Sequence, residues 1–332
     1  MSSWRQRITT WRAYWRKPRW RLGVFGLAAL VVTGLSSPRG IPFVGRETVW
    51  SIGIYSGPTL FDLQPLANCT NPVLTAEDID DVSARYVADP FLLRHGDGWV
   101  MFFEVFNREK WRGEIGFATS RDGCSWRYGG MVLQEPFHLS YPHVLLVDGE
   151  YFMIPESGAD KCVRLYRARD FPRQWEYVST LLAGEAFRDS SVFHRDGIWW
   201  MFTSIEKSEL RLYYADRLTG PWRPHPRNPL IANDAGVARG GGRVTTQNGQ
   251  LFRLAQDDHL SYGRQVRAFA ITELSKVNYR EIPVSHSPVV VAGNAAWNNL
   301  GMHQVDCQPL TNSTYIAAVD GLTSYFRVGL KY

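Results

Sequence analysis

The chain has 332 residues, of which 45% are hydrophobic and 14% aromatic, which is enough to build a substantial core and excludes a disordered chain. Its formal net charge of +5 suggests a nucleic-acid partner, but seven basic side chains and no acidic one lie within residues 1–21. The rest of the chain carries 30 basic against 32 acidic residues. The excess positive charge therefore belongs to the N-terminus, and we expect no nucleic-acid binding.

A short apolar run, Leu22 to Gly34, follows this basic stretch. The pattern is typical of a secretory signal or of an uncleaved signal anchor, and we favour the anchor because Pro38 lies close to the expected cleavage site. The positive-inside rule then places the basic end in the cytoplasm. Apolar residues within 1–21 recur at helical spacing, which fits an amphipathic segment in the headgroup layer and equally a long charged leader.

These features predict three parts: a basic amphipathic cytoplasmic segment over 1–21, a signal anchor and linker over 22–44, and a folded domain over 45–332. The folded domain is expected to be membrane-anchored on the extracytoplasmic side. Its four cysteines form no Cys-x-x-Cys pair, which argues against zinc. Their even number permits disulfides in an oxidising compartment without showing them.

A repeat of about fifty residues is the strongest signal in the chain. Residues 89–104, 141–156, 189–204 and 241–256 each read as an apolar strand, a turn with glycine, and a second, aromatic strand. Asp-Gly and Asn-Gly turns of this kind predict β-hairpins. The expected turn glycines are spaced 51, 48 and 52 residues apart, at Gly98, Gly149, Gly197 and Gly249.

A second motif follows each hairpin, at 115–126, 163–175, 210–222 and, more weakly, 266–279. Each copy predicts a third strand, a turn, and a fourth strand that begins with an aromatic residue. Four strands per repeat predict the blade of a β-propeller.

The last repeat is degenerate and supplies three expected strands over 303–329, while 50–55 is an isolated strand near the start. Joining the two would complete a fifth blade and remove an open sheet edge. The predicted fold is an all-β, five-bladed β-propeller with an N-terminal membrane anchor helix.

In a blade, the start of the first strand and the end of the second lie on the same face because the two strands are antiparallel. Acidic residues occupy these positions, and we expect them to meet at one mouth of the central funnel: Asp89, Glu104, Glu156, Asp189 and Asp257. Crowded and buried carboxyls have divergent pKa values, the setting in which one acts as a general acid and another as a base. Glycoside hydrolysis needs such a pair.

Structural explanations for the same residues remain open. The acids could end strands or pair with the arginines expected at the same level, which are Arg85, Arg188, Arg239 and Arg243. His138 and His303 could contact sugar or a central cation, although single histidines are more often structural.

Ala88-Asp-Pro-Phe91, the Gly-x-x-x-Met-Phe strands and the Arg-Asp-Gly-x-x-Trp turns resemble the five-bladed propellers of family 43 and family 32 glycoside hydrolases. Four further motifs, at 50–55, 136–142, 153–157 and 255–257, resemble the N-terminal propeller of plant glucosamine inositolphosphorylceramide transferases and its stand-alone bacterial relatives. The resemblance covers roughly residues 48–285.

The hydrolase resemblance implies that Asp89 is the base or nucleophile, Glu156 the acid, and Asp189 the residue that tunes their pKa values. Tyr141 stands at the matching position of the second blade, which leaves the tuning role to the third. The expected substrate-binding residues are Glu104, His138, Tyr141, Arg188, Arg239, Arg243, Asp257 and His303. In the transferases the resemblance places sugar transfer in a separate C-terminal domain.

Two functions follow as expectations. The first is a glycan-processing enzyme of glycoside hydrolase type that acts on an envelope or extracellular carbohydrate or glycolipid. The second is a catalytically inactive glycan-binding propeller that assists a separate glycosyltransferase. Neither requires an organic cofactor, and no metal ligand set is expected, although a structural cation near the funnel axis at His303 is compatible with both.

Overall fold

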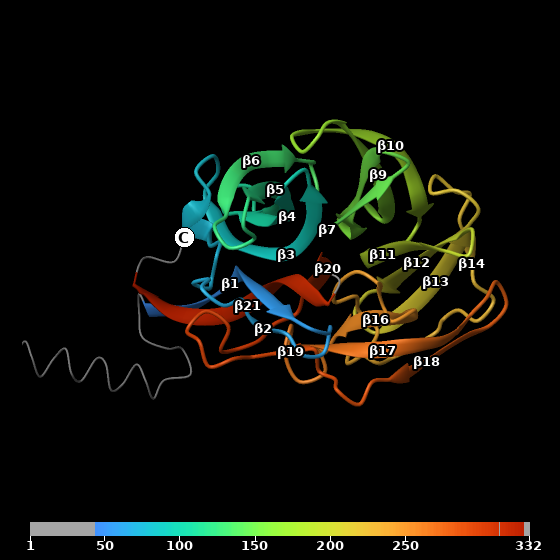
Figure 1. Ribbon diagram of the computed structural model, residues 1–332. Helices are drawn as coiled ribbons and strands as arrows, with labels where there is room; N and C mark the ends of the chain where they lie inside the picture. Colours follow the sequence, from blue (N-terminus) through green and yellow to red (C-terminus); the bar gives the residue numbers. More distant parts are fainter. Residues whose placement is uncertain (1–43, 312, 329–332) are drawn as a thin grey trace, which may run out of the picture. The chain divides into compact units, whose positions relative to one another are not determined.

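The computed structural model describes residues 44–311 and 313–328, and there the expected all-β, five-bladed propeller is confirmed (Figure 1). One compact unit covers Thr48–Ser324, and the remaining described residues belong to a second unit. Apart from strands, the described chain has two short 3₁₀ helices, Ala76–Asp78 and Gly158–Asp160. None of its helices is long and apolar enough to cross a membrane. The expected anchor and amphipathic segment lie outside the described residues.

The first four blades follow the chain in order as antiparallel sheets. Blade 1 contains β3 (Ala84–His95), β4 (Gly98–Asn107), β5 (Arg112–Ser120) and β6 (Arg127–Leu133). Blade 2 contains β7 (Ser140–Val147), β8 (Glu150–Ser157), β9 (Cys162–Asp170) and β10 (Gln174–Ala183). Blade 3 contains β11 (Phe187–Arg195), β12 (Ile198–Ile205), β13 (Glu209–Ala215) and β14 (Arg223–Pro224). Blade 4 contains β15 (Thr245–Gln247), β16 (Gln250–Gln256), β17 (Gln265–Leu274) and β18 (Tyr279–Pro283), with β19 (Val290–Val291) paired to β17.

Blade 5 joins the two ends of the described chain, as the sequence predicted. Its strand order is β2-β1-β21-β20, so the N-terminal strands extend a sheet begun by the C-terminal ones. The bounds are β1 (Val44–Gly57), β2 (Gln64–Pro65), β20 (Val305–Thr311) and β21 (Thr314–Val328). The last two strands expected within 303–329 are therefore one continuous strand, β21. Two strands come from each end, so both ends of the described chain share the sheet that closes the ring.

Three of the four expected hairpin turns have the predicted geometry. Asp148-Gly149, Asp196-Gly197 and Asn248-Gly249 all have positive φ at both residues, as a type I′ turn requires. The first turn is shifted by one residue, because Gly96 takes the positive φ of 55° and Gly98 already pairs with His95 at the start of β4.

The inner strand of blade 4 is shorter than predicted: β15 starts at Thr245 instead of Gly241. The physical reason lies at Gly242, where φ is 147° and a Cβ atom would stand 2.0 Å from the carbonyl oxygen of Val305. The backbone of blade 4 passes so close to blade 5 here that only glycine fits.

Apolar side chains fill the junctions between blades. Five buried clusters occur among the described residues, and each draws on two neighbouring blades. Trp99 and Trp200 are buried in two of these clusters, as the sequence predicted, and Trp199 packs at the edge of a third. The core of the propeller is thus a ring of sheet-to-sheet contacts.

Arg243 lies on the central axis rather than at the mouth. Its guanidinium pairs with Asp306 of blade 5 (2.6 Å) and donates to the carbonyl oxygens of Val144 in blade 2 and Leu92 in blade 1. One side chain from blade 4 therefore ties four blades together, and this position fits a structural role better than the expected contact with substrate.

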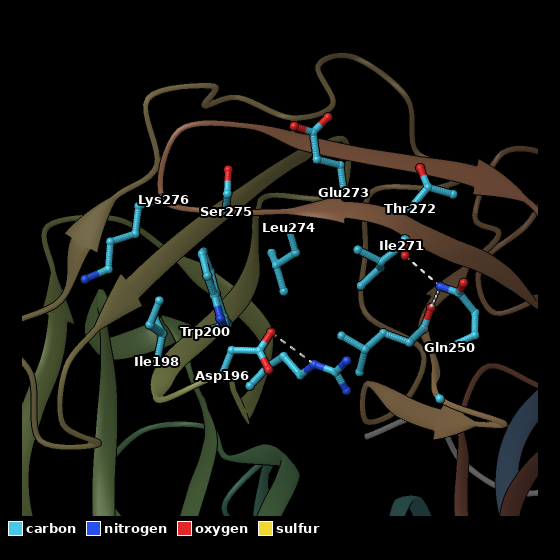
Figure 2. A pocket seen from close by; sticks show the side chains of 13 residues that line it. Asp196, Ile198, Trp200, Gln250, Ile271, Thr272, Glu273, Leu274, Ser275 and Lys276 are labelled. Carbon is cyan, nitrogen blue, oxygen red and sulfur yellow. Dashed lines mark hydrogen bonds and ion pairs between the residues drawn. The ribbon is translucent and has the colours of Figure 1, made fainter.

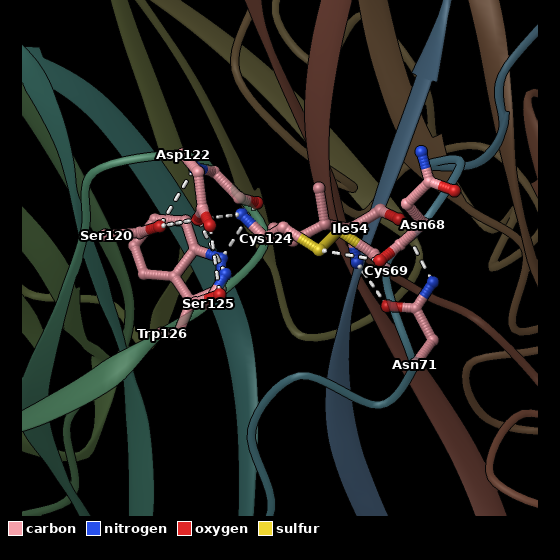
Figure 3. Close-up of a disulfide and its surroundings, with 10 residues drawn as sticks. Ile54, Asn68, Cys69, Asn71, Ser120, Asp122, Cys124, Ser125 and Trp126 are labelled. Atoms are coloured by element: carbon pink, nitrogen blue, oxygen red, sulfur yellow. Dashed lines mark hydrogen bonds between the residues drawn. A yellow bond between two sulfur atoms is a disulfide. The ribbon is translucent and has the colours of Figure 1, made fainter.

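A disulfide joins Cys69, in the segment after β2, to Cys124, in the turn between β5 and β6 (Figure 3). The turn itself is held by Asp122, which accepts hydrogen bonds from the backbone N–H groups of Cys124 and Ser125. The bond therefore fastens the N-terminal part of blade 5 to blade 1. Two other cysteines, Cys162 and Cys307, are buried as free thiols.

Candidate functional site

The inner strands of blades 1, 2 and 3 share one backbone irregularity. Asp89, Tyr141 and Asp189 have φ of 53°, 45° and 47°, and the strand register shifts around each of them. A β-bulge redirects the side chain at that point. Positive φ at a non-glycine residue has an energetic cost and is often found at functional sites. The three residues are thus structurally equivalent, as the repeat predicted.

Arg239 connects the carboxylates of blades 2, 3 and 4. Its Nε contacts Asp189 Oδ2 at 2.5 Å, and its terminal nitrogens lie 3.8 Å from Glu156 and 3.9 Å from Asp258. Gln256 donates a further hydrogen bond to the same oxygen of Asp189. All of these groups are buried or nearly so, which strengthens the charge interactions between them.

Glu156, at the end of β8, has a second cation in Arg188. The Arg188 guanidinium donates to Glu156 Oε1 at 2.7 Å, and about a third of that side chain remains exposed. The two carboxylate oxygens of Glu156 thus face two guanidinium groups, one from Arg188 and one from Arg239.

The acid of blade 1, Glu104, contacts a tyrosine and a histidine instead. The Tyr86 hydroxyl lies 3.4 Å from Glu104 Oε1, and His138 Nε2 lies 3.7 Å from the same oxygen. His138 Nδ1 accepts a hydrogen bond from the Gly113 N–H, so a neutral His138 carries its proton on the nitrogen that faces Glu104. Burial, together with Arg188 and Arg239, lowers the pKa of His138 to about 4, which keeps the ring neutral.

Asp89 of blade 1 contacts a second buried group, whose other members come from the segments that form blade 5. His303 Nε2 lies 3.8 Å from Asp89 Oδ1, and His303 Nδ1 lies 2.7 Å from Asp320. The His303 ring stacks on Trp50 with their centroids 3.8 Å apart. Burial alone lowers the pKa of His303, but Asp320 and Asp89 outweigh it and raise the value above the ordinary one.

Ligand atoms of Asp89, His303 and Asp320 lie within 4.8 Å of one another, close enough for a cation to be considered. The oxygens of Asp320 already accept the backbone N–H groups of His303, Gln304 and Asp89. Asp320 is thus held by backbone hydrogen bonds, whereas the buried Nδ1 of His303 has an ion-pair contact with Asp320 but no hydrogen bond of good geometry.

Burial raises the pKa of three acids at the mouth. The pKa values of Asp89 and Asp189 are both raised to about 7, with repulsion from Asp189 and Asp320 adding to burial at Asp89 and repulsion from Glu156 adding to burial at Asp189. Glu104 is raised well above its ordinary value, by burial first and then by Asp89 and Glu156. Burial and crowding at the mouth thus favour the protonated form of these three carboxyls more than water would.

Asp257 does not join this cluster. Both Gln265 and Arg267 donate to its Oδ2 at 2.7 Å, and these hydrogen bonds offset burial and lower its pKa. The next residue, Asp258, reaches Arg239 instead. Tyr141 is fully buried, and its hydroxyl bonds to Gly242 and Ser191, so it braces blades 2, 3 and 4 beneath the mouth.

Two further residues at the mouth, Tyr262 and Asp320, were not among those expected from the sequence. Tyr262, in the loop between β16 and β17, packs edge-on against Trp50 and His303 and lies under Arg239. A long irregular loop has no periodicity from which such a position could be derived. Asp320 could have been found, because it follows the apolar strand Tyr315–Val319 of blade 5.

A groove of about 400 Å³ lies elsewhere, between blades 3 and 4 (Figure 2). It is lined by the hairpin-turn residues Asp196 and Gly249 together with Trp200 and Lys276. These turns lie at the opposite ends of the strands from Asp189, so the groove is separate from the acidic mouth.

The five sheets around the acidic mouth define the chain as a five-bladed β-propeller. Solved structures share the fold: a glycoside hydrolase described as putative from Bacteroides ovatus aligns with TM-score 0.58 over 79% of this chain and 96% of its own, at 12% identity. The catalytic domain of the Coprinopsis cinerea GH62 alpha-L-arabinofuranosidase aligns with TM-score 0.55 over 84% and 98%, also at 12% identity.

Residues 44–322 match the family described as glucosamine inositolphosphorylceramide transferase 1, N-terminal, and the chain belongs to this family. The glucosamine inositolphosphorylceramide transferase 1 of Oryza sativa subsp. japonica is 36% identical over 299 residues, which cover 83% of this chain. The chain spans only about 40% of that relative's length.

Proposed function

We propose that this propeller is a glycan-processing enzyme of glycoside hydrolase type with its active site at the acidic mouth. The observation that supports it best is the pair Asp89 and Glu104, two buried carboxyls on adjacent strands whose pKa values are both raised by burial. Such a pair provides a base or nucleophile and a proton donor at one pH. No organic cofactor is needed for this chemistry.

Asp89 is the base or nucleophile in this proposal, as expected from the sequence. With a pKa of about 7 it is substantially ionised at neutral pH, and the neighbouring His303 lowers its pKa from the value that burial alone would give. The bulge at Asp89 holds the carboxyl in one orientation.

Glu104 is the proton donor, in place of the expected Glu156. A proton donor must hold its proton until the glycosidic oxygen needs it, and the raised pKa of Glu104 meets this condition. Glu156 is less suited, since its two carboxylate oxygens already face the guanidinium groups of Arg188 and Arg239. Asp189 keeps the tuning role, acting through Arg239.

A glycan-recognition module that assists a glycosyltransferase is the second candidate. It is favoured by the arginine pairing of Glu156 and Asp189, which suits hydrogen bonding to sugar hydroxyls as well as catalysis. The family of the chain also supports it, because its relatives bear the name of a transferase. The two candidates predict the same ligand class and differ in turnover.

We also propose that the propeller faces the extracytoplasmic side of a membrane, held there by the N-terminal segment. The Cys69–Cys124 disulfide supports this placement, since such bonds persist in oxidising compartments. A membrane-bound glycan or glycolipid is the substrate that such a position favours.

The first experiment measures hydrolysis by the full chain of aryl glycosides with good and poor leaving groups, and of envelope glycans. Asp89→Asn is expected to lose activity on all of them. Glu104→Gln is expected to lose about 10²–10⁴-fold on poor leaving groups and little on good ones, which need no proton donor. Asp216→Asn, an exposed acid on the outer edge, is the matched control.

The same assay separates the alternatives. Dependence on the leaving group in Glu156→Gln, and not in Glu104→Gln, would return the donor role to Glu156. Absence of turnover on every substrate, with glycan binding retained by wild type and Asp89→Asn, would leave the recognition module.

A further inference from the structure

Trp111 stands at the rim of blade 1 with 67% of its surface exposed. It ends the loop between β4 and β5, on the same side as Glu104, which lies three residues before the end of β4. Its φ is 53°, an unfavourable value for a large side chain. An exposed tryptophan in a costly backbone conformation is an arrangement that the rest of the structure must hold in place.

Buried polar groups hold the loop that carries Trp111. The Asn107 side chain accepts the backbone N–H groups of Glu109 and Lys110, and it donates to the fully buried Glu114. Lys110 closes the loop with an ion pair to Glu114 at 2.7 Å. The loop that carries Trp111 is thus anchored on a buried carboxylate.

The indole continues an aromatic row that leads to the site. Phe106 packs against Trp111 edge-to-face at 5.4 Å, and Tyr86 stacks on Phe106 at 5.0 Å. The hydroxyl of Tyr86 contacts Glu104, the proposed proton donor. Arg85 lies 5.3 Å from the centre of the Trp111 ring, which further fixes the indole.

We infer that Trp111 is the platform of an accessory sugar subsite, on which a pyranose ring of the glycan stacks while a neighbouring unit occupies the acidic mouth. A sugar ring presents a face of C–H groups, which an exposed indole can cover, and its hydroxyls stay in water. This inference rests on the proposed function and deepens it: the substrate is an oligosaccharide or glycolipid headgroup of at least two sugar units, not a single sugar.

The test compares nitrophenyl glycosides of one, two and three sugar units, built from whichever sugar wild type hydrolyses fastest as the single unit. In Trp111→Ala, KM for the longer glycosides is expected to rise about tenfold, with the single-unit glycoside unchanged. Trp111→Tyr, which keeps an aromatic face, is expected to restore most of the lost affinity. Tyr177→Ala, which removes an exposed aromatic residue of blade 2, is the matched control.

Equal KM values for Trp111→Ala and wild type at every length would overturn the subsite while leaving the enzyme. Activity that does not depend on Asp89 would instead reject the proposed function and this inference with it. Sedimentation with anionic lipid vesicles addresses the other use of an exposed tryptophan. Loss of vesicle binding by Trp111→Ala, without any change in KM, would assign the residue to a membrane surface and overturn the proposal.

Discussion

Asp89 and Asp189 occupy equivalent bulges, yet their surroundings differ. Asp189 faces a guanidinium at 2.5 Å, whereas the closest cationic partner of Asp89 is a histidine at 3.8 Å. Both carboxyls are almost completely buried and share the same raised pKa of about 7. Burying these two carboxyls in their ionised form is therefore unfavourable, and the rest of the fold must offset this cost.

This cost predicts a pH dependence of stability. Asp89 titrates near pH 7 in the folded protein and near its ordinary value of 3.8 when unfolded, so the folded chain binds more protons between these values. Its contribution is fully present below about pH 4 and is lost as pH rises through about 7. His303, with a raised pKa, acts in the same direction.

In Asp89→Asn this loss should disappear. The free energy of unfolding of the variant relative to wild type is expected to rise between pH 4 and pH 8, by up to about 4 kcal/mol. Urea unfolding of the two proteins across this range measures it. A constant difference at all pH values would mean that Asp89 titrates normally.

Among the elements, the inner edge of blade 4 shows how close backbone contacts join neighbouring blades. The inner edge of blade 4 carries no long strand, and its glycines allow Tyr141 and Val305 to contact its backbone. Blade 4 is therefore fastened by hydrogen bonds from its neighbours instead of by its own inner strand.

Gly242→Ala is expected to lower the free energy of unfolding by about 3 kcal/mol or more, since its Cβ would meet a backbone oxygen at 2.0 Å. Gly249→Ala is the control: it also has positive φ, but nothing lies within 4 Å of its Cβ. Only the cost of the left-handed conformation applies there, about 1–2 kcal/mol. Equal losses in urea unfolding would show that blade 4 can shift away from blade 5.

The Cys69–Cys124 disulfide affects the stability of the whole molecule, because it joins blade 5 to blade 1. The disulfide spans 55 residues and restricts the unfolded chain, which for a loop of this length stabilises the fold by about 4 kcal/mol at most. The double variant Cys69→Ala/Cys124→Ala is expected to melt at a lower temperature than wild type and to be insensitive to dithiothreitol. A wild type unaffected by the reductant would contradict this.

The repeat was enough to predict the number of blades, the hairpins and the shared last blade, because alternation of apolar residues and turn chemistry are local properties. The cysteine pairing was not accessible, since four cysteines allow three pairings. The sequence also did not predict which side chains pair with one another at the mouth and in the inner strands. Arg239 and Arg243 look alike in the sequence, but one gathers the acids of the mouth and the other bonds to the inner strands.

Arg243 has one more consequence. Many rings of repeated sheets leave an open passage along the axis, but here a guanidinium bonded to the backbone oxygens of Val144 and Leu92 fills it. A glycan bound in the proposed site would therefore have this guanidinium, and not an open channel, beneath it.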